Sequence, residues 1–120
     1  MITFVDDSES YIGLLEEIFD YRKDFKYYTN PCNLVLDLDN GKLQTKNIIS
    51  DYNMPGMDGI ILASYIAENH QNINIYIHSS CYRDTFSNEL ESGLIKGCKR
   101  KDYSLSSIES LVNKILDKEE

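Results

Sequence analysis

The residues of this chain that could do chemistry are carboxylates that follow short apolar runs. Asp6 and Asp7 come directly after one such run, and Asp51 follows another and precedes a Pro55-Gly56 turn. Clustered carboxylates repel one another unless a cation offsets their charge, and their oxygens are ligands that Mg²⁺ prefers. A metal held by all three could also contact a phosphoryl oxygen while one carboxylate attacks phosphorus. Asp51 is the candidate nucleophile because it stands singly at a strand end that faces the turn.

Two serine hydroxyl groups and one lysine ammonium group also lie at the ends of short runs in the sequence. Ser79 and Ser80 end an apolar run that starts at Ile73, and Lys101 ends a short segment that starts at Cys98. These side chains meet the carboxylates if the runs are parallel strands whose carboxyl ends share one edge of a sheet.

The pattern of apolar residues predicts the strands and helices that this arrangement needs. Short apolar or β-branched runs predict five strands, at residues 2–5, 26–29, 48–51, 73–79 and 98–101. Helical spacing and capping residues predict helices at residues 8–22 and 31–39, a third that follows the Pro55-Gly56 turn and runs to about residue 69, a fourth between Asp84 and Gly93, and a fifth with a capping box at Ser106 and Glu109.

Strand and helix therefore alternate five times, which predicts a single α/β domain over residues 1–120. Crossovers of this length require parallel pairing, and the right-handed crossover rule places helices on both faces of one doubly wound five-stranded sheet. Ligands of such a sheet bind beyond the carboxyl ends of the strands. The candidate residues all lie at that edge.

Composition and charge limit the class of protein. The 120 residues are 42% hydrophobic, enough for one core, and the net charge of -8 argues against direct nucleic acid binding, which needs clustered Lys and Arg. The three cysteines are an odd number and lack the spacing of a zinc site. The sequence has neither a signal-peptide pattern nor an apolar run of about 20 residues. We therefore expect a cytoplasmic protein that makes no membrane contact.

The sequence resembles the receiver domain of two-component response regulators. The motifs are the acidic pair Asp6-Asp7, the segment SDYNMPGMDG at residues 50–59 and the segment KDYSLS at residues 101–106. Their order and spacing are similar to those of the family over almost the whole chain. The resemblance implies a flavodoxin-like (βα)5 fold. It also implies a signalling domain that phosphorylates and dephosphorylates itself and does not act on outside substrates.

The resemblance implies a role for each acidic residue. Asp51 would accept a phosphoryl group from a partner histidine kinase or histidine phosphotransfer protein. Asp6, Asp7 and Asp51 would hold Mg²⁺, and the backbone carbonyl of Asn53 would complete the ligands from the protein. The phosphoryl group would shift the population of conformers and so signal to a protein target or to an effector domain.

Two further roles follow from the resemblance. Ser79 would be the switch hydroxyl that hydrogen-bonds the phosphoryl group, with Ser80 as the alternative because the strand register is open. Lys101 would be the ammonium group that pairs with the phosphoryl group. Lys99 is the alternative, but the segment that follows Lys101 favours the latter.

Two positions depart from the pattern of the family. Cys98 stands three residues before Lys101, where the family usually has a Tyr or Phe that reports phosphorylation, and Asp102 replaces the proline that usually follows the lysine. A cis peptide bond at that place would cost about 3–4 kcal/mol without proline. We expect the phosphoryl chemistry to survive these changes and the aromatic read-out to be altered.

A second hypothesis is a degenerate receiver that binds a partner without being phosphorylated. Cys98 and Asp102 favour it, whereas the complete set of acids, hydroxyl and ammonium opposes it. The chain would be either a stand-alone regulator or a receiver cut from a longer protein. His70 is predicted to end a helix in solvent and His78 to fill a strand position, and neither is assigned a catalytic role.

Overall fold

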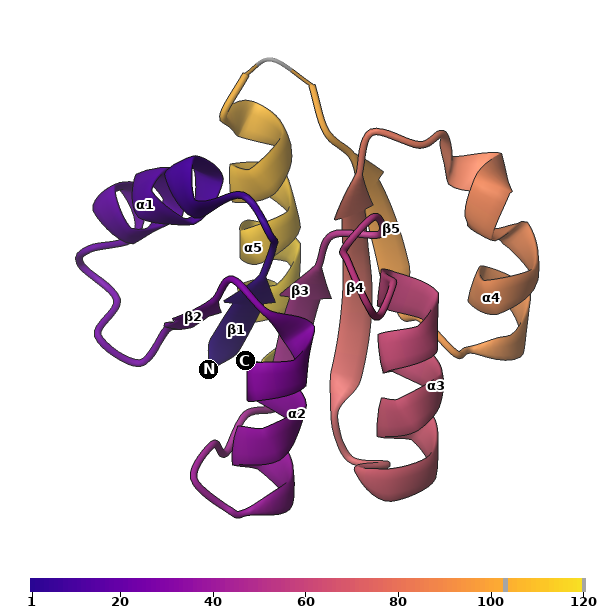
Figure 1. Ribbon diagram of the computed structural model, residues 1–120. Coiled ribbons are helices and arrows are strands. Elements are labelled where there is room, and N and C mark those ends of the chain that lie inside the picture. Colours follow the sequence, from indigo (N-terminus) through magenta and orange to yellow (C-terminus); the bar gives the residue numbers. More distant parts are fainter. Residues whose placement is uncertain (103, 120) are drawn as a thin grey trace.

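The computed structural model describes residues 1–102 and 104–119, which contain a five-stranded parallel sheet with helices on both faces (Figure 1). The strand order is β2-β1-β3-β4-β5. The strands are β1 (Ile2–Val5), β2 (Lys26–Tyr28), β3 (Asn47–Ser50), β4 (Asn74–Ser79) and β5 (Gly97–Arg100). The helices are α1 (Glu9–Ile18), α2 (Pro31–Asp39), α3 (Gly59–Asn69), α4 (Ser87–Ser92) and α5 (Ser106–Glu119), and a 3₁₀ helix, η1 (Arg83–Phe86), precedes α4. The predicted doubly wound fold is confirmed.

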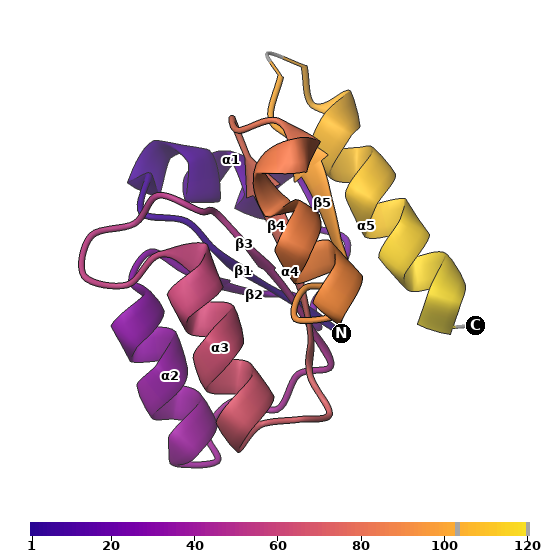
Figure 2. The same ribbon diagram turned by 90° about the vertical axis from the view of Figure 1, so that its right-hand side faces the viewer.

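The helices divide into two layers. α1 and α5 cover one face of the sheet, and α2, α3 and α4 cover the other (Figure 2). Side chains along β4 alternate between the two cores, as the period of a strand requires: Ile75 and Ile77 enter the core under α2 to α4, and Tyr76 enters the core under α1 and α5. Each large side chain buried in this way contributes about 1.5–3 kcal/mol. The order of strands reverses between β1 and β3, so a crevice is expected beyond their carboxyl ends.

The first helix is shorter than the predicted range 8–22. α1 ends at Ile18, with Phe19 as its C-cap. Phe19 and Phe25 are buried in the same core, so the chain must turn between them. Within this turn the Arg22 guanidinium donates to both carboxylate oxygens of Asp24 at 3.1 Å. The apolar stripe continues to Phe19, which is why the pattern did not mark the end of the helix.

Two helix starts also differ from the prediction. Asp84, the expected cap of the fourth helix, lies inside η1, and Tyr82 precedes η1 without a side-chain capping bond. Ser106 is the first residue of α5 and not its cap. Before this helix, Asp102 Oδ1 accepts from the Ser104 N–H at 2.9 Å.

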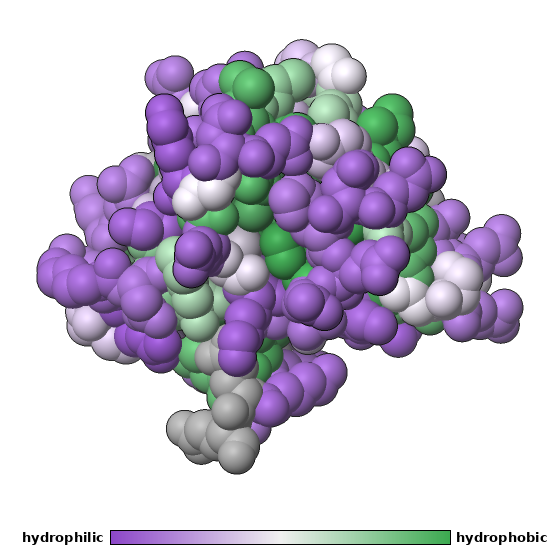
Figure 3. Space-filling model, turned by 90° about the horizontal axis from the view of Figure 1, so that it is seen from below, coloured by the Kyte–Doolittle hydropathy of each residue, from purple (hydrophilic) through white to green (hydrophobic). Residues whose placement is uncertain are grey.

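The two ends of the sheet have different surroundings. The carboxyl ends of the strands lie at the top of Figure 1. The opposite end, seen from below, is mostly hydrophilic with separate apolar patches (Figure 3). Within the described ranges, no helix combines the length and the apolar character needed to span a bilayer.

Candidate functional site

Three carboxylates lie together beyond the carboxyl ends of β1 and β3. Val5 pairs with Ser50 in the parallel register, so Asp6 and Asp51 leave the sheet side by side. One oxygen from each of Asp6, Asp7 and Asp51 lies within 4.8 Å of the others. The structure therefore brings together the three acids that the sequence singled out.

The donor set fits a hard divalent cation. Asp6 is buried, Asp51 is partly buried and Asp7 is exposed, so the cluster has a protein side and an open side. Mg²⁺ binds carboxylate oxygens and keeps several waters, which an open side can accommodate. Asn53, the source of the predicted carbonyl ligand, is exposed in the loop after β3.

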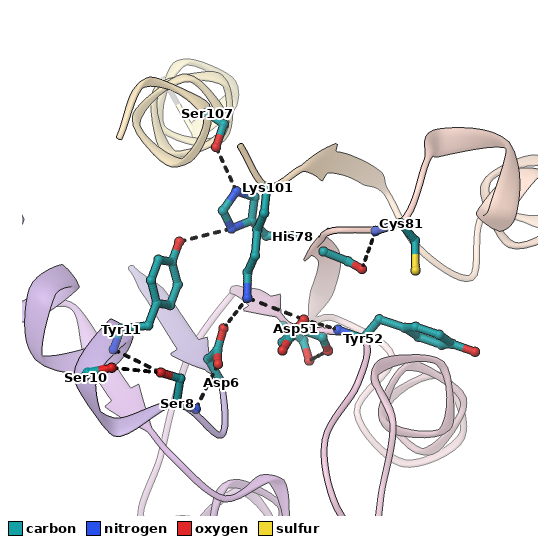
Figure 4. A network of polar contacts seen from close by, with 12 residues as sticks. Asp6, Ser8, Ser10, Tyr11, Asp51, Tyr52, His78, Cys81, Lys101 and Ser107 are labelled. Carbon is teal, nitrogen blue, oxygen red and sulfur yellow. Dashed lines mark hydrogen bonds and ion pairs between the residues drawn. The ribbon is translucent and has the colours of Figure 1, made fainter. Parts of the chain in front are cut away.

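The Lys101 ammonium group lies between two of the acids. Its Nζ is 2.7 Å from Asp6 Oδ2 and 3.5 Å from Asp51 Oδ1 (Figure 4). Lys101 follows β5, and β4 separates β5 from β3, so the side chain extends across the end of β4. This one cation offsets part of the repulsion between the carboxylates. Lys99, the alternative to Lys101, lies within β5 and pairs in register with His78 of β4.

Burial is the main influence on the pKa of the Asp51 carboxyl group. It raises the pKa of this carboxyl above its ordinary value, the Lys101 ammonium opposes that rise, and the Asp6 carboxylate adds to it. The Tyr52 N–H donates to Asp51 Oδ1 at 2.8 Å and favours the charged form. Keeping Asp51 ionised in this partly buried position therefore costs free energy. A further cation among the three carboxylates would reduce that cost.

The loop that carries Asp51 packs closely against the start of α3. The Gly59 N–H donates to the Tyr52 carbonyl at 2.8 Å. A Cβ on Gly59 would lie 2.5 Å from the Asp51 carbonyl oxygen and 2.9 Å from Ile77 Cδ1. Asp58 caps the helix, since its Oδ1 accepts from two backbone N–H groups in the first turn. Gly59 thus permits the close approach that fixes the position of Asp51, a role that the sequence alone did not reveal.

The two candidate hydroxyl groups have different surroundings. Ser79 is 1% exposed, and its Oγ accepts from the Cys81 N–H at 3.1 Å. Ser80 is exposed and, with Lys101, lines a cavity of about 510 Å³ between α1 and the start of α5. Both serines thus stand at the end of β4, and the choice between them as the switch hydroxyl stays a prediction.

A buried histidine next to the site was not predicted to have a role. His78 is 3% exposed, and its Nδ1 lies 3.1 Å from the Tyr11 hydroxyl while its Nε2 lies 3.0 Å from Ser107 Oγ (Figure 4). Burial lowers the pKa of His78 to about 4. The only sequence signal was a histidine in an otherwise apolar strand, and nothing in it indicated partners on α1 and α5.

The structure shows the surroundings of the two positions that depart from the family pattern. Cys98 is partly buried, and Arg83 Nη1 lies 3.8 Å from its Sγ. Burial raises the pKa of this thiol, and the nearby guanidinium opposes the rise. The described residues contain no cis peptide bond, so the bond between Lys101 and Asp102 is trans and the family's proline geometry is not kept.

Comparison with known proteins identifies the fold. No family model matches the sequence, and no curated protein matches it. Solved structures do match. The signal receiver domain of an HD domain-containing protein from Pseudomonas fluorescens Pf-5 has a TM-score of 0.80 at 15% identity, over 97% of this chain and 93% of that one. The chain has the receiver-domain fold.

Two further receivers support this assignment over nearly their full lengths. The receiver domain of the Francisella response regulator 1452 has a TM-score of 0.79 at 17% identity, over 99% of this chain and 98% of that one. Response regulator TrrA from Thermotoga maritima, solved in complex with Mg²⁺ and BeF, has a TM-score of 0.74 at 19% identity, over 94% and 96%. The resemblance to receiver domains inferred from the sequence motifs is thus confirmed for the fold.

Replacing Gly59 by alanine should disturb the loop that carries Asp51. The added Cβ would lie 2.5 Å from the Asp51 carbonyl oxygen, so the backbone has to shift. We expect the free energy of unfolding in urea to fall by roughly 1–3 kcal/mol. The matched control is Gly13→Ala in α1, where nothing lies within 4 Å of the new Cβ and no loss is expected. Equal stability of Gly59→Ala and the wild type would contradict the close-approach role.

The buried state of His78 predicts a pH dependence of stability. Its pKa is about 4 in the folded chain, against an ordinary value of 6.5 for an exposed histidine, so between these values only the unfolded chain takes up the proton. The free energy of unfolding should therefore fall as the pH is lowered, by roughly 2 kcal/mol between pH 7 and pH 5. Urea denaturation at both pH values should show this loss in the wild type and in His70→Gln, and a smaller loss in His78→Gln. An unchanged loss in His78→Gln would rule out a buried neutral imidazole.

Proposed function

We propose that this chain is a phosphoacceptor receiver domain, with residues 1–120 as one functional unit and Asp51 as the acceptor. The observation that carries the proposal is the Lys101 ammonium group, which lies 2.7 Å from Asp6 and 3.5 Å from Asp51. A cation held at clustered acids at the switch point of a doubly wound sheet is suited to stabilise charge on a phosphoryl group. The likeness of the fold to response regulator receivers supports this choice.

The proposed reaction is a transfer between two side chains. A carboxylate oxygen of Asp51 forms a bond to phosphorus while the phosphorus–nitrogen bond of a partner's phosphohistidine breaks, and the imidazole leaves with the electron pair. The Lys101 ammonium then pairs with phosphoryl oxygens, and the hydroxyl of Ser79 or Ser80 donates to another. Water later hydrolyses the acyl phosphate and restores Asp51.

A magnesium ion fits the acidic cluster. Asp6, Asp7 and Asp51 would hold it, with the backbone carbonyl of Asn53 as a further ligand. When bound, the ion supplies charge stabilisation for the phosphoryl oxygens. The donor chemistry of the three acids supports this assignment, as does the presence of Mg²⁺ in the TrrA complex.

The proposed partners follow from the reaction. The phosphoryl donor is a histidine kinase or a histidine phosphotransfer protein in the cytoplasm, and the output goes to a protein target or to an effector domain. The domain does not act on outside substrates, and the net charge of -8 disfavours direct nucleic acid binding. It signals by the conformational shift that the phosphoryl group stabilises.

The second candidate function is a degenerate receiver that binds its partner without phosphorylation. The observation in its favour is Cys98, which takes the place of the usual aromatic residue and contacts Arg83. The two functions differ in whether Asp51 ever carries a phosphoryl group.

Incubation with Mg²⁺ and acetyl phosphate tests the acceptor. Intact mass spectrometry should show the gain of one phosphoryl group, about 80 Da, in the wild type and in the control Asp117→Asn, whose acid is exposed on α5. Asp51→Asn should gain nothing because it lacks the nucleophile. A wild type that gains no mass, or an Asp51→Asn variant that gains it equally, would refute the acceptor role.

Magnesium should stabilise the folded chain through the same acids. At ten times its Kd, an ion that binds only the folded state adds about 1.4 kcal/mol to the free energy of unfolding. Thermal melts over a Mg²⁺ titration should show this gain in the wild type and in Asp117→Asn. Asp7→Asn should show little gain, because the variant lacks one ligand. No stabilisation of the wild type at any millimolar concentration would favour the degenerate receiver.

A further inference from the structure

Three residues from three separate elements form a chain of polar contacts beside the acidic cluster. Tyr11 comes from α1, His78 from β4 and Ser107 from α5, and the two contacts of His78 measure 3.1 and 3.0 Å (Figure 4). His78 is 3% exposed and Ser107 is 4% exposed. The network therefore ties both helices of one layer to β4.

A neutral imidazole can use both of its nitrogens in this network. A neutral histidine has one N–H donor and one acceptor nitrogen, and the hydroxyls of Tyr11 and Ser107 can each take the complementary role. Either tautomer satisfies all three groups. Because burial lowers the pKa of His78 to about 4, the imidazole adds no second positive charge near Lys101.

Tyr11 connects the network to the Lys101 ammonium group. Lys101 Nζ lies 4.8 Å from the centroid of the Tyr11 ring while it donates to Asp6 Oδ2 at 2.7 Å. A cation at this distance from an aromatic face is attracted by the ring. Tyr11, His78 and Lys101 also line the cavity of about 510 Å³, so the ring and the ammonium have room for other positions.

We propose that His78 is a positioning residue for Lys101. The Nδ1 of His78 holds the Tyr11 hydroxyl, so that the Tyr11 ring packs against the Lys101 ammonium and keeps it between Asp6 and Asp51. The consequence for phosphoryl transfer rests on the proposed function, whereas the placement of Lys101 does not.

Two amide variants separate the two contacts of His78. The amide of asparagine falls near the position of Nδ1, and that of glutamine near the position of Nε2. His78→Asn therefore retains a partner for Tyr11, and His78→Gln retains one for Ser107 only. Tyr11→Phe keeps the ring and removes the hydroxyl. We expect Tyr11→Phe to behave like His78→Gln, and His78→Asn to behave like the wild type.

The first readout needs no phosphoryl donor. In NMR spectra of the full chain, the ε-methylene protons of Lys101 should be shifted upfield by the Tyr11 ring in the wild type, in His78→Asn and in the matched control His70→Gln. In His78→Gln and in Tyr11→Phe they should move toward the usual lysine position. Retention of the full upfield shift in these two folded variants would overturn the proposal. Tyr11→Phe, at a partly buried position, provides the test if His78→Gln does not fold.

The second readout is the rate of phosphorylation by acetyl phosphate. His78→Gln should lower it by roughly tenfold, since misplacing a catalytic group by about 1 Å can cost up to a hundredfold. In a Lys101→Met background, the same substitution should change the remaining rate by less than about twofold, because coupled residues are not additive. An equal loss in both backgrounds would indicate a purely structural histidine and overturn the proposal. If the wild type gains no phosphoryl group, the proposed function fails. The chemical shift of the Lys101 ε-methylene protons still decides whether His78 positions Lys101.

Discussion

The contact of the Lys101 ammonium with Asp6 and Asp51 is the interaction on which the site depends. Two carboxylates follow neighbouring strands, one of them is buried, and their mutual repulsion must be offset in the folded chain. The cation that does so comes from beyond β5, across the end of β4. The strand order and the parallel register are therefore conditions for the site: only they place the ends of β1, β3 and β5 close enough for one side chain to join them.

Much of this arrangement could be predicted from the sequence. Runs such as Ile2–Val5 are too apolar and too short for anything but buried strands, and acids at their ends must share one edge of a parallel sheet. The partners of His78 could not be predicted, because Tyr11 and Ser107 are 67 and 29 residues away and are matched to it only by packing. The need for Gly59 was hidden for the same reason, since the atoms that a Cβ would meet belong to Asp51 and Ile77.

Of the two departures from the family pattern, Cys98 packs against the core under α2 to α4, whereas Asp102 lines the same cavity as His78 and Tyr11. Around Cys98 the chain has a thiol against the Arg83 guanidinium, and the neighbouring Arg100 guanidinium lies 4.1 Å from the centroid of the Tyr82 ring. On the other face, His78 joins α1 and α5 to the surroundings of Lys101. The polar contacts of His78 therefore link the surroundings of the acidic site to α1 and α5.

The most direct test of Asp51 as the phosphoacceptor is chemical trapping of an acyl phosphate. After incubation with Mg²⁺ and acetyl phosphate, borohydride reduces an acyl phosphate of aspartate to homoserine, and peptide mapping locates it. We expect homoserine at position 51 in the wild type and none in Asp51→Asn. Homoserine at another acid, or none at all in the folded wild type, would contradict Asp51 as the phosphoacceptor.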